Sequence, residues 1–232
     1  MTTSHVKIPR PLTVAVSSFS PLVDKFLELD DGHLIIRLGE MSGGIWRDGI
    51  VETRFEEILS AMDAYTGWDE VGGWKDLHEY EFRVGDEHIC TEVHIGDGVN
   101  VSHATKTHLE VLNLKLMNHG FARGMVNIHT PVCSNKIPET VTPERVWIRK
   151  KKVYTLKYWR FTAMYVWKGD SRTLAEEAQS KGDTEFCIEV ELCPDPGFWG
   201  GASSSPTYIA TSMLMKVVDL ISSEMVSVEP CK

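Results

Sequence analysis

The sequence lacks long hydrophobic runs, and no apolar stretch approaches the ~20 residues that a membrane-spanning helix needs. This argues against a membrane protein. The N-terminal sequence MTTSHVKIPRPLTVAVSSF also lacks the long apolar core and the small-residue cleavage site of a signal peptide. We therefore expect an intracellular protein that makes no contact with a membrane.

Cysteine and histidine motifs are equally scarce. The five cysteines are odd in number and show no CxxC spacing, which indicates reduced thiols and neither a disulfide framework nor a zinc site. The nine histidines form no HxH or HExxH pattern, and no GxxxxGK[ST], GxGxxG or GxSxG motif occurs. These absences argue against zinc hydrolases, P-loop enzymes, Rossmann enzymes and α/β-hydrolases.

Positive charge is also in short supply. The 232 residues carry 24 Lys and Arg against 33 Asp and Glu, a net charge of −9. Proteins that coat nucleic acid are usually basic, so this balance argues against that role but leaves a local basic channel open. With 42% hydrophobic and 25% charged residues, the chain has the composition of a folded protein.

The periodicity predicts an α+β fold dominated by antiparallel strands. Apolar spacing predicts four helices, at 20–29, 53–65, 171–181 and 207–223, the first of them with Ser20 as N-cap and Pro21 in its first turn. Between them lie many alternating strands, including a hairpin at 77–96 that turns at Gly85 and Asp86. Alternation with charges on one face suggests a barrel with a polar interior. We expect a loose arm at 1–18, a single domain at 19–226 and a tail at 227–232.

The segment 145–160 concentrates positive charge, with seven Lys or Arg and no acid. Strand alternation places Trp147, Arg149, Lys151 and Val153 on one face. Such a strand could be an exposed edge whose lysines discourage aggregation. The concentration of positive charge in an acidic protein favours the other interpretation, a phosphate-binding strand.

Paired glutamates occur on two predicted strands. Glu189 and Glu191 are two residues apart and share a face, and Glu79 and Glu81 form a second such pair. Such pairs commonly lie on a solvated outer face. If a pair points into a barrel, a divalent cation such as Mg²⁺ or Mn²⁺ would relieve the repulsion between its carboxylates.

Read in order, these segments resemble the metal-dependent, tunnel-fold mRNA 5′-triphosphatases, and the small free-standing type found in kinetoplastid protozoa is the most similar branch. HLIIRLGEMSGGIW, the Gly49–Ile50 step and the helix RFEEIL resemble the family's opening strand and helix. ICTEVHIG followed by Lys106, and NIHTPV followed by the basic strand, resemble its middle strands. FCIEVEL resembles its late metal-binding strand. The resemblance covers roughly residues 20 to 225.

The resemblance implies an antiparallel eight-stranded β-barrel (triphosphate tunnel) flanked by helices. It also implies a hydrolase that removes the γ-phosphate from nascent RNA in mRNA capping, a step of mRNA processing in the nucleus. Arg37, Lys106, Arg149 and Lys151 would bind the phosphates, and Glu189 and Glu191 would hold Mg²⁺ or Mn²⁺. The partners would be the RNA 5′-triphosphate end and an RNA guanylyltransferase or another capping protein.

The chain departs from the family pattern at several of these positions. His33 and Ile35 stand where the family has two metal-binding acids, Cys90 replaces an arginine, and Trp147 occupies an expected polar position. Acids nearby that could substitute are Asp30, Asp31, Glu40 and Glu92. Each lost transition-state contact costs about two to three orders of magnitude in rate, so the departures weaken the case for activity.

Three hypotheses therefore stay open. The first is an active RNA 5′-triphosphatase. The second is a catalytically degenerate paralogue, a pseudoenzyme, that binds RNA 5′ ends or triphosphates as a regulatory subunit of capping. The third is a tunnel-fold protein that acts on a small triphosphate such as a nucleotide or tripolyphosphate.

Overall fold

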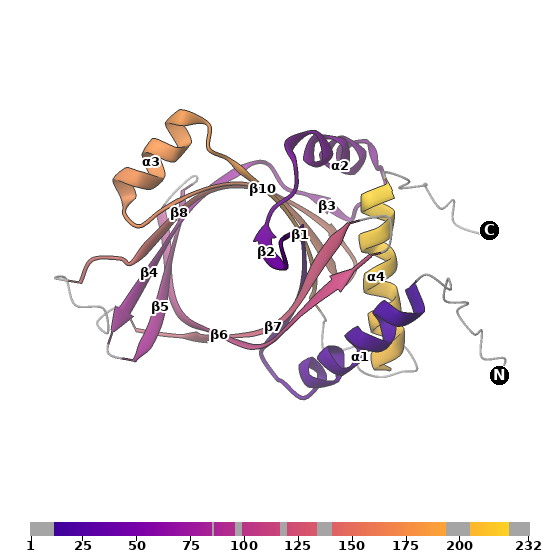
Figure 1. Ribbon diagram of the computed structural model, residues 1–232. Helices are drawn as coiled ribbons and strands as arrows, with labels where there is room; N and C mark the ends of the chain where they lie inside the picture. Colours follow the sequence, from indigo (N-terminus) through magenta and orange to yellow (C-terminus); the bar gives the residue numbers. More distant parts are fainter. Residues whose placement is uncertain are drawn as a thin grey trace.

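The computed structural model describes residues 12–84, 86–95, 99–116, 120–133, 141–193 and 205–222. Within them, eight antiparallel strands close into a barrel, which confirms the predicted fold class (Figure 1). The barrel strands are β1 (Gly32–Ser42), β4 (Lys75–Val84), β5 (Glu87–Ile95), β6 (Val99–Lys115), β7 (Phe121–Pro131), β8 (Arg145–Leu156), β9 (Trp159–Gly169) and β10 (Glu185–Leu192). Two short strands, β2 (Ile45–Asp48) and β3 (Glu70–Val71), pair with β1 and β8.

Around the barrel the strands follow the order β1, β10, β9, β8, β4, β5, β6 and β7, and β7 pairs again with β1. Five of these pairs of neighbouring strands are also consecutive in the sequence, as expected for a meander. The pairing of Val84 with Glu87 confirms the predicted hairpin between β4 and β5. Pairing of β1 with β10 closes the sheet, so none of the described barrel strands has a free edge. The basic strand β8 pairs with β4 on one side and β9 on the other, and it is therefore not an exposed edge strand.

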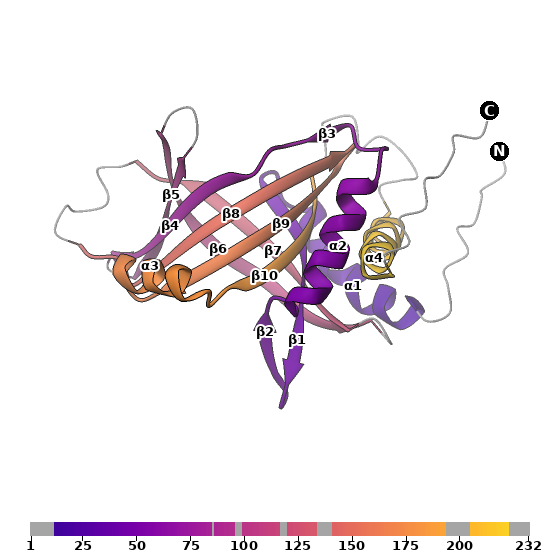
Figure 2. The same ribbon diagram turned by 90° about the horizontal axis from the view of Figure 1, so that it is seen from above.

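Four helices cover the outside of the barrel in the described residues: α1 (Thr13–Leu27), α2 (Glu52–Ala64), α3 (Arg172–Lys181) and α4 (Pro206–Ser222). Helices α1 and α4 pack against each other beside β1 and β7, and α2 lies next to α4 and β10 (Figures 1 and 2). Helix α3 covers β8 and β9. None of the helices in the described ranges is long and apolar enough to cross a membrane.

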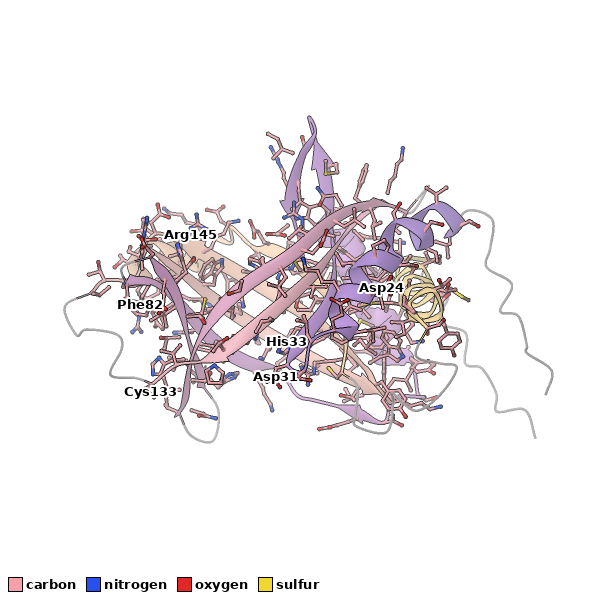
Figure 3. The ribbon with its side chains drawn as sticks, turned by 90° about the horizontal axis from the view of Figure 1, so that it is seen from below. Asp24, Asp31, His33, Phe82, Cys133 and Arg145 are labelled. Atoms are coloured by element: carbon pink, nitrogen blue, oxygen red, sulfur yellow. The ribbon has the colours of Figure 1, made fainter. Side chains whose placement is uncertain are left out.

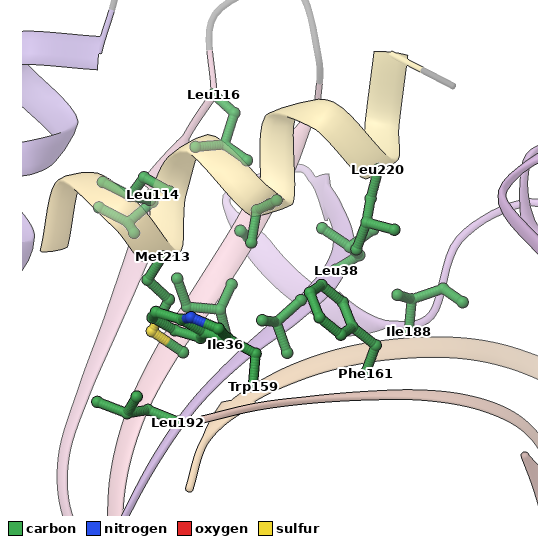
Figure 4. Packing of buried hydrophobic residues seen from close by; sticks show 14 of the residues in the cluster. Ile36, Leu38, Leu114, Leu116, Trp159, Phe161, Ile188, Leu192, Met213 and Leu220 are labelled. Atoms are coloured by element: carbon green, nitrogen blue, oxygen red, sulfur yellow. The ribbon is translucent and has the colours of Figure 1, made fainter. Parts of the chain in front are cut away.

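The main hydrophobic core lies between the barrel wall and α4, outside the barrel (Figure 4). Ile36 and Leu38 of β1 meet Met213 and Leu220 of α4 there, and all four side chains are at most 2% exposed. Burying each such side chain contributes about 1.5 to 3 kcal/mol. Apolar burial therefore holds α4, together with α1 and α2, against one side of the barrel, whereas α3 packs separately on β8 and β9.

Helix α1 begins at Thr13, which corrects the predicted start at Ser20 and places residues 13–18 of the expected arm in a helix. Pro21 consequently lies inside the helix, where its missing N–H leaves one helical hydrogen bond unmade. Val16 and Phe19 are buried on the same face as Phe26, and this apolar contact outweighs the cost of the proline. The sequence-based prediction placed Pro21 in the first turn because it did not take the burial of Val16 and Phe19 into account.

Strand β6 contains a bulge between His108 and Glu110. Before the bulge Lys106 faces the barrel interior, and after it Leu114 faces the helical core. The ammonium of Lys25 on α1 donates to the carbonyl oxygen of Leu109 at 3.2 Å and to Glu110 Oε2 at 3.1 Å. Helix α1 thereby satisfies a carbonyl at the irregular point of the strand.

Candidate functional site

The direction of the side chains on β1 establishes which residues line the barrel. Leu34, Ile36 and Leu38 are buried in the core beneath the helices, so they point outward. Successive side chains of a strand point to opposite faces, so His33, Ile35 and Arg37 point into the barrel. Residues paired across neighbouring strands share a face, so the same inner face can be followed through the whole sheet.

The predicted phosphate-binding, metal-binding and departing positions lie on this inner face: His33, Ile35, Arg37, Cys90, Lys106, Trp147, Arg149, Lys151, Glu189 and Glu191. Of the acids named as possible substitutes, Glu92 shares this face, whereas Glu40 lies on the opposite face of β1 and Asp30 and Asp31 precede that strand. The barrel therefore brings together groups that lie up to 158 residues apart in the chain, as in the contact of His33 with Glu191. Their roles in phosphate or metal binding stay predictions. Their neighbours, however, are now defined.

A first charged group joins β4, β5, β6 and β8. Glu79 is buried, with its carboxylate bound by Arg149 on one oxygen and by Lys106 on the other, at 3.1 Å from Nζ. Lys106 also donates to Glu92 Oε1 at 2.9 Å, and Glu92 Oε2 lies 3.4 Å from His94 Nε2. The contacts thus run from Arg149 through Glu79 and Lys106 to Glu92, so that cations and acids alternate along a chain that joins four strands.

The electrostatics of this group favour its charged forms. Burial alone would raise the pKa of Glu79, but Arg149 and Lys106 hold it below its usual value. In the same way, Lys106 outweighs the effect of burial and lowers the pKa of Glu92 to about 2. Burial would lower the pKa of Lys106, but Glu79 and Glu92 raise it. All these groups are therefore ionised at neutral pH.

A second charged group lies where β1 meets β10. Arg37 binds Glu189 through its Nε at 2.7 Å and through Nη2, and its Nη1 lies 3.3 Å from Asp48 on β2. The negative charge of Glu189 raises the pKa of Arg37 despite burial. Arg37, predicted to bind phosphate, and Glu189, predicted to bind a metal, are thus bound to each other in this structure.

Glu191 forms the centre of a third group. Its Oε1 lies 2.7 Å from His33 Nδ1, and its Oε2 accepts from Arg160 at 2.9 Å. Burial would raise the pKa of Glu191, but His33 and Arg160 hold it low. The ring of His129 stacks on His33 at 4.3 Å, and burial together with repulsion from His33 and Lys106 lowers the pKa of His129 to about 4. His129 is therefore neutral at physiological pH.

Lys151 differs from the other inward cations. Among the residues that the structure describes, no carboxylate lies within ion-pair distance (4.0 Å) of its ammonium. Burial lowers the pKa of Lys151; the negative charges of Glu92 and Glu189 raise it from beyond ion-pair distance, and repulsion from Arg149 and Arg160 lowers it further. Within the described ranges, Lys151 is thus a partly buried positive charge without a directly bound carboxylate.

The donor set does not fit a Mg²⁺ or Mn²⁺ site. These ions prefer several oxygen ligands in one place. No group of three or more His, Cys, Asp or Glu side chains converges in this way within the described ranges. Ile35 offers no donor atom, and Glu189 and Glu191 are both bound by cationic or imidazole groups. The geometry therefore provides no step that passes through a metal.

Sequence reasoning assigned no role to three interior residues that have clear partners in the structure. Arg160 ends the basic segment 145–160, but it lies on the next strand, and His129 lies in NIHTPV, so only the pairing of the strands reveals their direction. Glu79 was one of an ambiguous pair with Glu81, and its burial at 4% exposure distinguishes the two. Alternation along the basic strand places Trp147 and Arg149 on the inner face. Because Glu79 pairs with Trp147, it shares that face, so this alternation is the signal that could have identified Glu79.

The closed eight-stranded antiparallel barrel with its four helices matches the triphosphate-tunnel fold of RNA triphosphatases. The RNA triphosphatase Pct1 of Schizosaccharomyces pombe aligns with a TM-score of 0.68 over 91% of this chain and 93% of that chain, at 12% identity. A structure of Pct1 in complex with the Spt5 CTD gives a TM-score of 0.65 over 94% of both chains, at 10% identity.

The RNA triphosphatase domain of the mimivirus mRNA capping enzyme aligns with a TM-score of 0.60 over 89% of this chain and 97% of that chain, at 8% identity. No protein-family model matches the chain, and no curated protein matches it by sequence. At these identities the likeness shows the fold alone.

Proposed function

We propose that this chain binds the 5′-triphosphate end of RNA inside its barrel, as an RNA-end-binding or regulatory subunit of mRNA capping. The observation that carries the proposal is Lys151, a partly buried ammonium between Arg149 and Arg160 that has no carboxylate bound to it among the described residues. A phosphate group is the natural anion for such a cluster of cations. The proposal takes RNA as the ligand because the fold is that of RNA triphosphatases.

Binding without the usual hydrolysis is the activity that this geometry supports best. The interior acids Glu79, Glu189 and Glu191 are each bound by at least one basic or imidazole side chain, so they are not free to collect a divalent cation. Removing several contacts to a transition state costs many orders of magnitude in rate. The cations that would bind the ground-state triphosphate remain.

Hydrolysis of the γ-phosphate is the second candidate. It is favoured by one observation, that Glu189 and Glu191 share the inner face of β10 while Lys151 and Arg149 share the inner face of β8. Carboxylates and cations are thus present inside one barrel. A nuclear location and contact with a guanylyltransferase or another capping protein belong to both versions of the proposal.

Fluorescence anisotropy with a short labelled RNA tests the proposal. The RNA with a 5′-triphosphate should bind at least tenfold more tightly than the same RNA with a 5′-hydroxyl, and Lys151→Glu should abolish this preference. Lys150→Glu is the matched control, because Lys150 is exposed on the opposite face of the same strand. Equal binding of the two RNAs, or equal loss in the two variants, would contradict the proposal.

Release of γ-phosphate from the same RNA separates the two candidates. With Mg²⁺ or Mn²⁺ and high protein concentration, we expect no release above the background of Lys151→Glu. Release that depends on metal and on Glu189 would establish the second candidate instead. Competition by inorganic tripolyphosphate or ATP that equals the triphosphate RNA in affinity would assign the site to small triphosphates.

A further inference from the structure

The interior of the barrel is not polar along its whole length. Met164, Val166 and Cys187 form a cluster of buried residues, each at most 5% exposed, and Trp147 packs against it. These four residues face inward, because Cys187 pairs with Met164, Met164 pairs with Lys151, and Val166 pairs with Arg149. We call this cluster the apolar plug.

The plug lies toward one end of the barrel. On β8, Trp147 precedes Arg149 and Lys151, and on β10, Cys187 precedes Glu189 and Glu191. On β9, which runs the other way, Met164 and Val166 follow Arg160. All three strands therefore displace the plug toward the end where β8 and β10 begin, which we call the Arg145 mouth.

The opposite end, the His33 mouth, is polar. Figure 3 shows His33 and Arg145 toward opposite ends of the barrel. His33 and Arg160 keep 35% and 47% of their side-chain surface exposed, and Lys106 and Arg149, deeper in the barrel, keep about a fifth. Lys106 and Arg149 thus keep part of their surface exposed inside the barrel, whereas Met164, Val166 and Cys187 of the plug are almost completely covered.

The rim beyond the plug is held by ion pairs. Lys168 pairs with Glu185, and His88 Nδ1 lies 3.0 Å from Glu81 Oε1. Lys168 is thus partly neutralised by Glu185, while Arg145 at the same mouth is exposed and lies 4.0 Å from Glu81 Oε2. The packing of the plug therefore favours access from the other end.

On this basis, and resting on the proposed binding of triphosphate, we infer that the barrel admits its ligand only through the His33 mouth and that Trp147, Met164, Val166 and Cys187 close the other end. The ligand class is then the terminus of a polyphosphate chain, which enters end first and stops at the plug. Internal phosphodiesters of RNA cannot thread through. Trp147, whose ring lies 5.8 Å from the Arg149 guanidinium, also limits how far that side chain can move toward the Arg145 mouth.

Blocking each mouth in turn tests the inference. In a Cys133→Ser, Cys193→Ser, Cys231→Ser background, one variant carries Ser102→Cys and another carries Lys168→Cys. Ser102 is exposed on the inner face of β6 next to Glu92 and marks the His33 mouth, and Lys168 marks the other. Each is coupled to a maleimide polyethylene glycol, and binding of inorganic tripolyphosphate is measured by calorimetry.

The label at Ser102→Cys should weaken binding at least tenfold, and the label at Lys168→Cys should change it less than twofold. Adding Trp147→Ala and Met164→Ala should remove the plug and restore binding to the protein labelled at Ser102→Cys. Equal effects of the two labels, or a larger effect at Lys168→Cys, would overturn the single entrance.

A measurement without ligand keeps this inference separate from the proposed function. The Cys187 thiol, protected by the plug, should react slowly with a charged methanethiosulfonate, and Trp147→Ala should speed the reaction at least tenfold as measured by mass spectrometry. Unchanged reactivity would overturn the plug even if tripolyphosphate binds. Absence of tripolyphosphate binding to the unlabelled protein would instead overturn the proposed function.

Discussion

Glu79 on β4 and Lys106 on β6 form an ion pair inside the barrel, with Oε1 and Nζ 3.1 Å apart, although β5 lies between their strands. The contact passes over the inner face of β5, because Glu79 pairs in the sheet with Glu92 of β5 and Lys106 binds both carboxylates. A single ammonium thus holds two acids on adjacent strands. Breaking this arrangement should affect both stability and anion binding.

Glu79→Gln should lower the free energy of unfolding by about 3 kcal/mol, because it leaves Arg149 and Lys106 in the interior with one carboxylate fewer. The same variant should bind tripolyphosphate more tightly, since the two cations lose a competing anion. Urea unfolding and calorimetry measure the two effects. Glu81→Gln, on the same face but at the rim beside His88, is the control and should change both quantities little. Weaker tripolyphosphate binding by Glu79→Gln would contradict this interpretation.

The stabilisation from Glu92 should depend on pH in a defined direction. Its pKa is about 2 in the folded protein and 4.5 in the reference state, so its contribution is fully present above about 4.5 and is lost as the pH falls toward 2. Urea unfolding of the natural protein and Glu92→Gln should differ by on the order of 2 kcal/mol at neutral pH. The difference should vanish in strong acid.

Glu110→Gln serves as the control for this experiment. Its carboxylate pairs with Lys25 on the exposed outer surface, where such a pair contributes at most about 1 kcal/mol. A difference between the natural protein and Glu92→Gln that persists unchanged at the lowest pH would show that Glu92 acts by packing and not by charge.

Placing acids on the first strand should create a response to metal ions. Ile35 pairs directly with Glu191, so His33→Glu with Ile35→Glu would place two new carboxylates beside Glu191 and Glu189. Without metal the repulsion should lower the melting temperature, and millimolar Mn²⁺ should raise it again. The natural protein should show no shift with Mn²⁺. A comparable shift in both proteins would reveal ligands that the present donor set does not contain.

Gly124 on β7 is a contact point for α1. A Cβ atom added there would lie 2.4 Å from a ring carbon of Phe19 and 3.1 Å from Leu22. Gly124→Ala should therefore push α1 away and lower the free energy of unfolding by about 1 to 3 kcal/mol. The control is Gly73→Ala, where a Cβ meets no atom within 4 Å. Hydrogen exchange of the α1 amides should rise in Gly124→Ala alone.

The faces of the strands were accessible from the sequence, and their contacts were not. Alternation in RVWIRKKKV correctly separated Arg149 and Lys151 from Ile148, because a strand turns successive side chains to opposite sides. Alternation cannot say which acid a lysine meets. The pairing of Arg37 with Glu189 joins segments 152 residues apart, and the register of β1 on β10 determines it.

The apolar plug was hidden for the same reason. Trp147, Met164 and Cys187 come from three strands, and each residue alone looks like an isolated apolar position in a polar pattern. Only the pairing of β8 with β9 and of β9 with β10 brings them into contact. The start of α1 at Thr13 was missed because the burial of Val16 and Phe19 under α4 and the barrel wall is a tertiary effect.

The bulge in β6 determines which residues of the strand face the barrel interior and which face the helices. The single extra residue, Leu109, reverses the facing of everything that follows, so one strand supplies Lys106 to the interior and Leu114 to the helical core. Deleting or inserting one residue on either side of the bulge would turn the interior-facing side chains of that half of β6 outward and the outward-facing ones inward. Insertions and deletions in β6 should therefore be tolerated in steps of two residues. Lys25 of α1, which donates to the carbonyl of Leu109, holds the bulge in its position.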